Sequence, residues 1–244
     1  MTKYFKNKTL MTLISVLSLS LILVGCIEKK VNADDLIHKS IETMKALDSY
    51  TSSVYVTFAT SEDGSSKVNM NALIDCHKEP FAYSNVQQII ADSGSTGTPD
   101  SNPNNLILTM ILKDSVLYTN NSVTGLWSEE TEPNLIKEVT DNGDFFQNFA
   151  ADQFTDLEMV SVSKNKATIK ARSTNSDFLK SLLNSFSTEV TGNVEMIIDI
   201  ETKYIESFTY YPEIDGSSSE NNKITIKTTD FNNATEVQVP KEAL

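Results

Sequence analysis

Thiol and imidazole groups are scarce in this sequence, which limits nucleophilic and general-base chemistry. The 244 residues contain two cysteines, Cys26 and Cys76, and two histidines, His38 and His77. Cys76 and His77 are adjacent, and neighbours on a strand point to opposite faces of a sheet. Cys76 also continues an alternation that begins at Val68, so we expect it to be a small buried residue. His38 falls within an amphipathic helix pattern, where we expect it to face solvent.

Carboxylates are abundant, but their spacing does not indicate catalysis. Acid pairs such as Asp34-Asp35 and Glu129-Glu130 are expected by chance in a chain with 33 acidic residues. The sequence contains no Gly-x-Ser-x-Gly elbow, no His-Glu-x-x-His, no phosphate-binding glycine-rich loop and no dinucleotide fingerprint. We therefore expect no enzyme activity, no catalytic residue, no bound metal and no cofactor.

Cys26 is the residue for which the sequence indicates a specific chemistry. Residues 1–8 are basic, and residues 10–24 are apolar apart from one threonine and three serines. An apolar run of about 15 residues rises only about 22 Å as a helix, short of a hydrocarbon core of about 30 Å. A cleaved signal peptide explains this run better than a permanent span. The alternative is a short transmembrane anchor with a buried cysteine.

The sequence Leu23-Val24-Gly25-Cys26 resembles the bacterial lipobox, in which a small residue precedes an invariant cysteine. This resemblance implies that Cys26 carries diacylglycerol and palmitate-type acyl chains and becomes the new N-terminus. One acyl chain holds a protein on a membrane only marginally, whereas two hold it durably. We therefore expect a cell-membrane protein that is lipid-anchored on the extracytoplasmic face.

The expected organisation is a signal peptide over residues 1–25, a lipidated tether over residues 26–32 and a single domain over residues 33–244. Removal of the first 25 residues, which carry three lysines and no acid, takes the formal net charge from −13 to −16. A chain with this negative charge lacks the surplus of basic residues that phosphate contacts require. We therefore expect no nucleic-acid partner.

The spacing of apolar residues predicts helices and strands in a mixed order. Helices are expected at residues 33–48, 133–139, 144–154 and 176–186. About ten strands are expected, at residues 50–60, 67–76, 81–91, 106–112, 116–119, 157–163, 167–172, 189–200, 204–211 and 223–231. Residues 106–112 are nearly all apolar, which predicts a buried strand. Long strands joined by short turns favour one antiparallel sheet with helices on one face, an α+β fold.

This order of elements resembles the lipoprotein-carrier superfamily, which includes the localisation factors LolA and LolB and the mycobacterial LppX and LprG lipoproteins. The resemblance is carried by residues 33–58 and 194–240, including the segment Ile198 to Ile205. It implies a curved antiparallel sheet that forms an incomplete barrel, with helices covering the concave face. It also implies an apolar hollow that binds acyl chains, with residues 144–154 and 176–186 near its mouth. The composition gives no sign of a Gram-negative envelope, so we expect a Gram-positive surface.

The resemblance leads to the hypothesis that the protein binds a lipid or another hydrophobic ligand non-covalently. Candidates for the cavity wall are the apolar residues Val54, Val56, Phe58, Met70, Met110, Phe146, Phe149, Met196, Ile198 and Phe208. The same residues would form an ordinary core if phenylalanines of the helices filled the hollow. In that alternative the protein is a surface interaction module that contacts a protein or cell-wall partner through loops such as residues 92–105 or 216–222.

Overall fold

The computed structural model describes residues 31–59, 67–92, 105–174, 191–214, 217–218 and 222–244. The chain divides into two compact units, residues 1–32 and residues 33–244, and the second contains all the helices and strands described below. Cys26, the expected helix at 176–186 and most of the two expected loops lie outside the described residues. The signal peptide, tether and domain boundaries therefore stay predictions. Within the described residues, no helix combines the length and apolar character needed to cross a bilayer.

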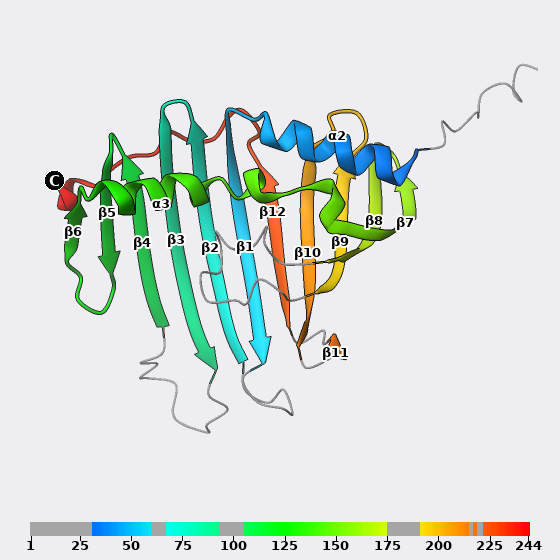
Figure 1. Cartoon of the computed structure of the whole chain (residues 1–244). Helices are drawn as coiled ribbons and strands as arrows, with labels where there is room; N and C mark the ends of the chain where they lie inside the picture. Colours follow the sequence, from blue (N-terminus) through cyan, green and yellow to red (C-terminus); the bar gives the residue numbers. More distant parts are fainter. Residues whose placement is uncertain (1–30, 60–66, 93–104, 175–190, 215–216, 219–221) are drawn as a thin grey trace, which may run out of the picture. The chain divides into compact units, whose positions relative to one another are not determined.

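The first half of the sheet is a meander of six antiparallel strands. They are β1 (Ser49–Ala59), β2 (Lys67–Lys78), β3 (Phe81–Asp92), β4 (Asn105–Lys113), β5 (Val116–Asn121) and β6 (Trp127–Glu130). Each strand pairs with the next in sequence, so β6 forms one edge of the sheet (Figure 1).

The second half completes the sheet on the other side of β1. Its strands are β7 (Phe154–Ser163), β8 (Lys166–Ser173), β9 (Gly192–Asp199), β10 (Ile205–Ile214) and β12 (Lys223–Thr229), with the two-residue β11 (Ser217–Ser218) paired to β10. The spatial order is β6-β5-β4-β3-β2-β1-β12-β10-β9-β8-β7. The strands at its ends, β6 and β7, do not pair with each other, so the sheet stays open among the described residues.

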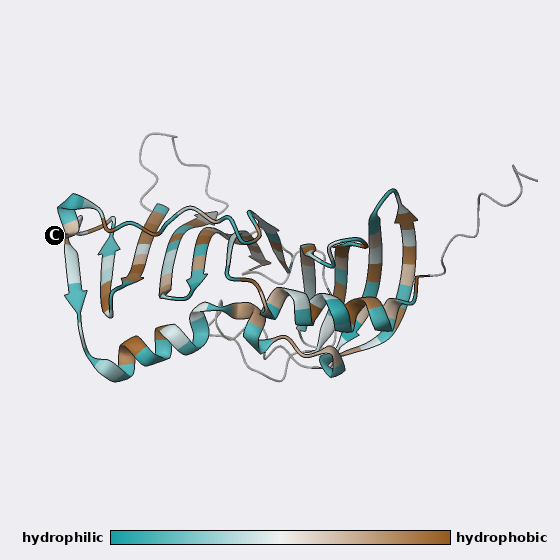
Figure 2. Cartoon of the chain, turned by 90° about the horizontal axis from the view of Figure 1, so that it is seen from above, coloured by the Kyte–Doolittle hydropathy of each residue, from teal (hydrophilic) through white to brown (hydrophobic). Residues whose placement is uncertain are grey.

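Side-chain alternation gives the sheet an inner face, which the helices cover, and an outer face (Figure 2). One cross-strand row on the inner face shows how the core forms: Val54 lies opposite Ile226, Ile226 opposite Phe208, and Phe208 opposite Met196. All four side chains are buried. The predicted α+β class, a curved antiparallel sheet forming an incomplete barrel with helices on its concave face, is confirmed.

Helix α2 (Ala33–Lys45) packs against the second half of the sheet (Figure 1). Asp34 and Asp35 occupy its first turn and Lys45 its last, an arrangement that complements the helix dipole. Its buried stripe is formed by Leu36, Ile37, Ser40, Ile41 and Met44. His38 lies on the opposite side and is exposed, as predicted.

Helix α3 (Pro133–Gly143) lies over β3 to β5, on the same side of the sheet as α2 (Figures 1 and 2). It begins with Pro133, and the side chain of Glu132 accepts a hydrogen bond from the Leu135 amide. Gly143 is its only buried residue. The helix therefore covers the sheet without burying any of its own large side chains.

The helix expected at residues 144–154 is replaced by two 3₁₀ turns, η1 (Phe145–Asn148) and η2 (Ala151–Gln153). The Asp144 side chain accepts from the Phe146 amide and starts the first turn. Phe145 and Phe146 are adjacent, and both are fully buried. Phe149 and Ala150 have extended backbone angles, which end the first turn and separate it from the second.

The C-terminal residues 230–244 cross the outer face of the sheet (Figure 2). The Lys113 ammonium group forms an ion pair with Glu236 and donates to the Val237 carbonyl. Nε2 of His77 lies 2.9 Å from the Thr235 carbonyl oxygen. These contacts, with buried Val237, cover the outer face at the upper ends of β2 and β4.

Candidate ligand-binding site

The half of the inner face beneath α2, η1 and η2 is filled by aromatic side chains. Phe145 packs edge-on against Tyr50 with 5.6 Å between ring centroids, and Phe149 packs against Phe208 with 5.2 Å. Phe146 lies between Phe145 and Phe149, and all five rings are fully buried. Aromatic pairs at such distances contribute beyond the area that they bury. This half of the sheet, which we call the packed half, therefore has a core of packed aromatic side chains.

A buried ion pair fixes the start of η1. The Lys78 ammonium lies 2.7 Å from Oδ2 of Asp144, and Tyr50 donates a hydrogen bond of 3.0 Å to Oδ1 of the same carboxylate. Lys78 also donates to the Lys45 carbonyl at the C-terminal end of α2. One lysine thus joins β2, α2 and the residue that begins η1.

Cys76 lies beside this ion pair and is fully buried, as predicted. Burial, together with the nearby Asp144 charge, raises the pKa of the Cys76 thiol to about 12. Burial also raises the pKa of Tyr50 well above its ordinary value. Because the thiolate is the reactive form of cysteine, Cys76 is a structural residue at neutral pH.

Of the ten proposed cavity-wall residues, seven belong to the packed half or its border and are fully buried: Val54, Val56, Phe146, Phe149, Met196, Ile198 and Phe208. Phe58, Met70 and Met110 are only half-buried. That these ten residues line a ligand cavity stays a prediction. The structure nevertheless separates them into a fully buried group and a half-buried group.

The other half of the inner face, from β2 to β5, keeps apolar side chains partly exposed toward the strand ends that lie away from Cys76. Met70 pairs with Ile89, and Ile89 pairs with Leu106, across β2, β3 and β4. Two residues along β4, Leu108 and then Met110 continue on the same face. These side chains and Val68 form what we call the apolar stripe, and each is half-buried: Val68, Met70, Ile89, Leu106, Leu108 and Met110.

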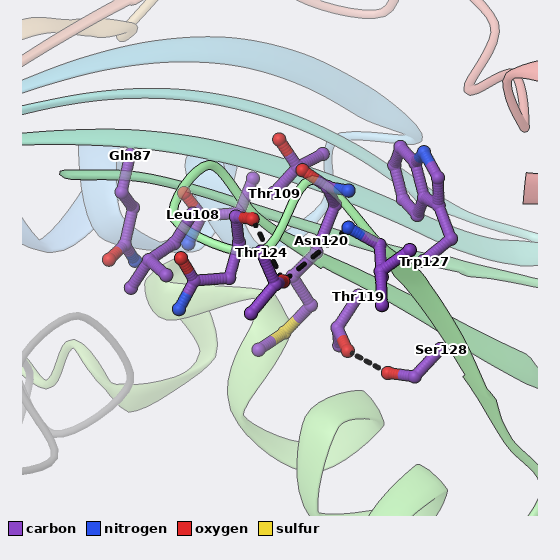
Figure 3. Close-up of a pocket in the computed structure, with 12 residues that line it drawn as sticks. Gln87, Leu108, Thr109, Thr119, Asn120, Thr124, Trp127 and Ser128 are labelled. Atoms are coloured by element: carbon purple, nitrogen blue, oxygen red, sulfur yellow. Dashed lines mark hydrogen bonds between the residues drawn. The ribbon is translucent and has the colours of Figure 1, made fainter. Parts of the chain in front are cut away.

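A pocket of about 520 Å³ adjoins the stripe at the β6 side of the sheet (Figure 3). Leu108 and Met110 form part of its wall, together with Thr119 and Ser128, whose hydroxyl oxygens lie 2.6 Å apart. The remaining lining residues come from β3 to β6 and the loop before β6: Asn85, Gln87, Thr109, Asn120, Asn121, Thr124, Leu126 and Trp127. Thr119 and Ser128 lie on one side of the sheet, whereas Thr109, Asn120 and Trp127 lie on the other (Figure 3).

Leu106 and Leu108 are not among the site residues expected from the sequence, because the apolar run at 106–112 predicts a buried strand. That expectation is wrong for most of β4: Ile111 and Leu112 are buried, but Leu106 and Leu108 are half-buried and Ile107 is exposed. The sequence signal for partial exposure lay in β3, where Asn85 and Gln87 occupy inner-face positions. Asn and Gln are mostly exposed in proteins, so their presence indicates that the neighbouring strand β4 is not fully buried.

Among the described residues, no group of three histidine, cysteine, aspartate or glutamate side chains is arranged to hold a metal ion. The lining of the pocket is likewise free of charged side chains. The chemistry that the site offers is therefore apolar contact and neutral hydrogen bonding.

No protein-family model matches the sequence, and no curated protein matches it significantly. Solved structures do match. The lipoprotein LppX of Mycobacterium tuberculosis aligns over 84% of this chain and 98% of its own, with 14% identity and a TM-score of 0.51. LprF of Mycobacterium bovis aligns over 86% of this chain and 97% of its own, with 11% identity and a TM-score of 0.49. The likeness to LppX shows that this chain has the same fold as that lipoprotein, the fold that the resemblance in its sequence implied.

Proposed function

We propose that the protein binds a lipid or another hydrophobic molecule non-covalently on the open half of its inner face. The observation that carries this proposal is the apolar stripe, which continues from β2 to β4 and meets the pocket. Ligand pockets in proteins commonly enclose about 300–1,000 Å³ and combine apolar walls with a few polar groups. A volume of about 520 Å³ falls within this range.

The contrast between the two halves supports binding over an ordinary core. In the packed half, aromatic side chains cover the inner face and the strand residues beneath them are fully buried. On the same side of the sheet, Leu135, Ile136 and Val139 of α3 also remain half-buried. Apolar side chains that stay partly exposed form a surface on which an apolar ligand gains free energy.

The same arrangement weighs against a role as an interaction module with a solid interior. That alternative requires packed side chains over the whole inner face, whereas the stripe residues are only half-buried. It also weighs against catalysis, because the thiol of Cys76 is buried and protonated and His77 contacts the C-terminal segment. We therefore propose a binding protein without enzyme activity.

We also propose that the protein works at a membrane, as a lipoprotein anchored through Cys26 on the extracytoplasmic face, on a Gram-positive surface. The support is the leader that ends in Leu-Val-Gly-Cys and the fold shared with a mycobacterial lipoprotein. A tethered domain of this kind stays close to the membrane from which an apolar ligand is taken.

Native mass spectrometry of the full-length protein, purified from its own host in a mild detergent, tests the binding proposal. We expect a reproducible co-purified lipid. Leu108→Gln places a polar group in the stripe and should reduce lipid occupancy about tenfold, since burying an amide without a partner costs roughly 1–3 kcal/mol.

Ile107→Gln is the matched control, because Ile107 is the preceding residue on β4 and points to the outer face. It should leave lipid occupancy unchanged. Equal loss in both variants would point to a general effect on folding, and a bare protein mass in the wild type would contradict the proposed function.

A further inference from the structure

We propose that the pocket recognises an uncharged head group that bears hydroxyl donors, so that the ligand is a neutral lipid with a glycerol or sugar head. This inference rests on the proposed function and adds the chemical class of the ligand. It follows from three features of the pocket: an unpaired buried acceptor, a lining without charge and the position of the apolar stripe.

The unpaired acceptor belongs to Asn85, on the pocket wall. The residue is only 6% exposed, and its Nδ2 donates a hydrogen bond of 2.9 Å to the Tyr83 hydroxyl. This bond fixes the amide, and its Oδ1 has no hydrogen-bond partner in the part of the chain that the structure describes. Buried polar atoms are nearly always paired in native proteins, so an exception calls for an explanation. A donor brought by a ligand would supply the missing partner.

The lining excludes charged head groups. Among the described residues that form it, there is no lysine or arginine that would neutralise a phosphate and no carboxylate that would pair with an amine. The charged residues that follow the lining residue Ser128 are Glu129 and Glu130, which would repel an anion. Burying an unpaired ion is far more costly than burying a neutral group that can be hydrogen-bonded.

The polar groups that line the pocket suit hydroxyls. Asn and Gln amides offer both donors and acceptors, and Ser and Thr hydroxyls do the same. Thr119 and Ser128 already form a hydroxyl pair on the inner face, and Gln87 precedes the stripe residue Ile89 by two positions on β3. Neighbouring hydroxyls of a glycerol or sugar match such a set of groups.

The stripe fixes the orientation of the ligand. It leads from Met110 and Leu108, at the pocket, to Leu106, Ile89 and Met70 along the paired strands. A lipid with its head at Asn85 would therefore lay its acyl chains over these side chains, toward the ends of β2 to β4 that lie away from Cys76.

The test compares lipids that share the same two oleoyl chains, added to the full-length lipidated protein in mild detergent and counted by native mass spectrometry. Dioleoylglycerol and its glucosyl derivative should bind about tenfold more tightly than dioleoylphosphatidylglycerol, dioleoylphosphatidylcholine or the methyl ether of dioleoylglycerol. The methyl ether matters most, because it removes the hydroxyl donor and adds no charge.

Asn85→Leu should remove the preference for the hydroxyl over the methyl ether while the variant still binds the ether. Gln88→Leu, an amide lost from the outer face of the same strand, should keep the wild-type preference. If all the lipids bind equally well, the inference fails and the proposed function stands. If none binds, the proposed function fails. The wild-type comparison decides the question even if Asn85→Leu does not fold.

Discussion

Lys78 and Asp144 form a buried ion pair that a single substitution can break. Lys78→Met leaves the Asp144 carboxylate buried without its cation, and removing one partner of a buried pair costs about 3–5 kcal/mol. Urea unfolding of a fragment spanning residues 27–244 should show a loss of free energy of unfolding in this range. The start of η1 and the end of α2 both depend on this lysine.

Lys137→Met is the control for this experiment. Lys137 pairs with Asp141 on the exposed side of α3, and exposed helix pairs of this spacing contribute only about 0.3–0.5 kcal/mol. A Lys78→Met variant that is no less stable than Lys137→Met would show that the buried pair does not form in solution.

Cys76 should make the stability of the protein depend on pH in the alkaline range. Its folded-state pKa is about 12, against an ordinary value of 9.0, so between these values the unfolded state releases a proton that the folded state retains. The stabilising contribution is complete below pH 9 and is lost as the pH rises toward 12, at about 1.4 kcal/mol per pH unit.

The window from pH 9 to 10 isolates the thiol, because the raised pKa of Tyr50 takes effect only above the ordinary tyrosine value of 10.0. Urea unfolding at several pH values should show a shallower slope for Cys76→Ala than for the wild type. Parallel slopes for the two proteins would mean that the thiol is not held in its neutral form.

The elements differ in how firmly they are packed, which should appear in amide hydrogen exchange. Helix α2 buries five side chains, whereas α3 buries only Gly143. Segments with few buried contacts open locally at low free energy, so α3 amides should exchange roughly tenfold or more faster than those of α2. Mass spectrometry of deuterated peptides measures this difference.

Addition of the ligand should slow exchange in β4, where Leu106 and Leu108 would contact it, and leave α2 unchanged. Equal exchange of the two helices in the ligand-free protein would indicate that α3 is packed as firmly as α2.

Alternation along the strands was enough to predict the sheet and its inner face. The residues Val54, Val56, Met196 and Ile198 were assigned to one face from spacing alone, and all are buried there. The spacing of apolar residues along a strand does not specify which other segment packs against that face of the sheet. Val56 and Met70 are direct partners on neighbouring strands, yet one is buried and the other half-buried, because the filling phenylalanines come from a distant segment.

The sequence was least informative where local signals conflicted. The phenylalanines at 145, 146, 149 and 154 suggested helical spacing, but extended backbone at Phe149 and Ala150 divides the segment into two 3₁₀ turns. In β4 the apolar composition suggested burial, although Leu106 and Leu108 are half-buried on the inner face and Ile107 is exposed on the outer face. Both differences are set by tertiary packing, which single-residue propensities do not contain.

Among the described residues of the folded unit, two helices and two short turns cover the long sheet, and part of its inner face stays half-exposed. Apolar strand faces need a second layer, and aromatic residues of the described segments provide it beneath α2, η1 and η2. The packed half supplies a rigid wall, and the open half supplies the surface that a ligand covers. Binding would therefore complete a core that the described residues leave unfinished.

The membrane anchor is a property of the whole chain, and the two cysteines give a matched test of it. Cells grown with radioactive palmitate should yield labelled protein in the membrane fraction. Cys26→Ala removes the acceptor sulfur and should abolish both the label and cleavage of the leader. Cys76→Ala should keep both, because Cys76 is buried in the folded domain.

If Cys26→Ala remains in the membrane only as the uncleaved precursor, lipidation is supported, since the leader itself then holds the chain. If the wild type carries no label and keeps its first 25 residues, the short transmembrane anchor is the correct interpretation.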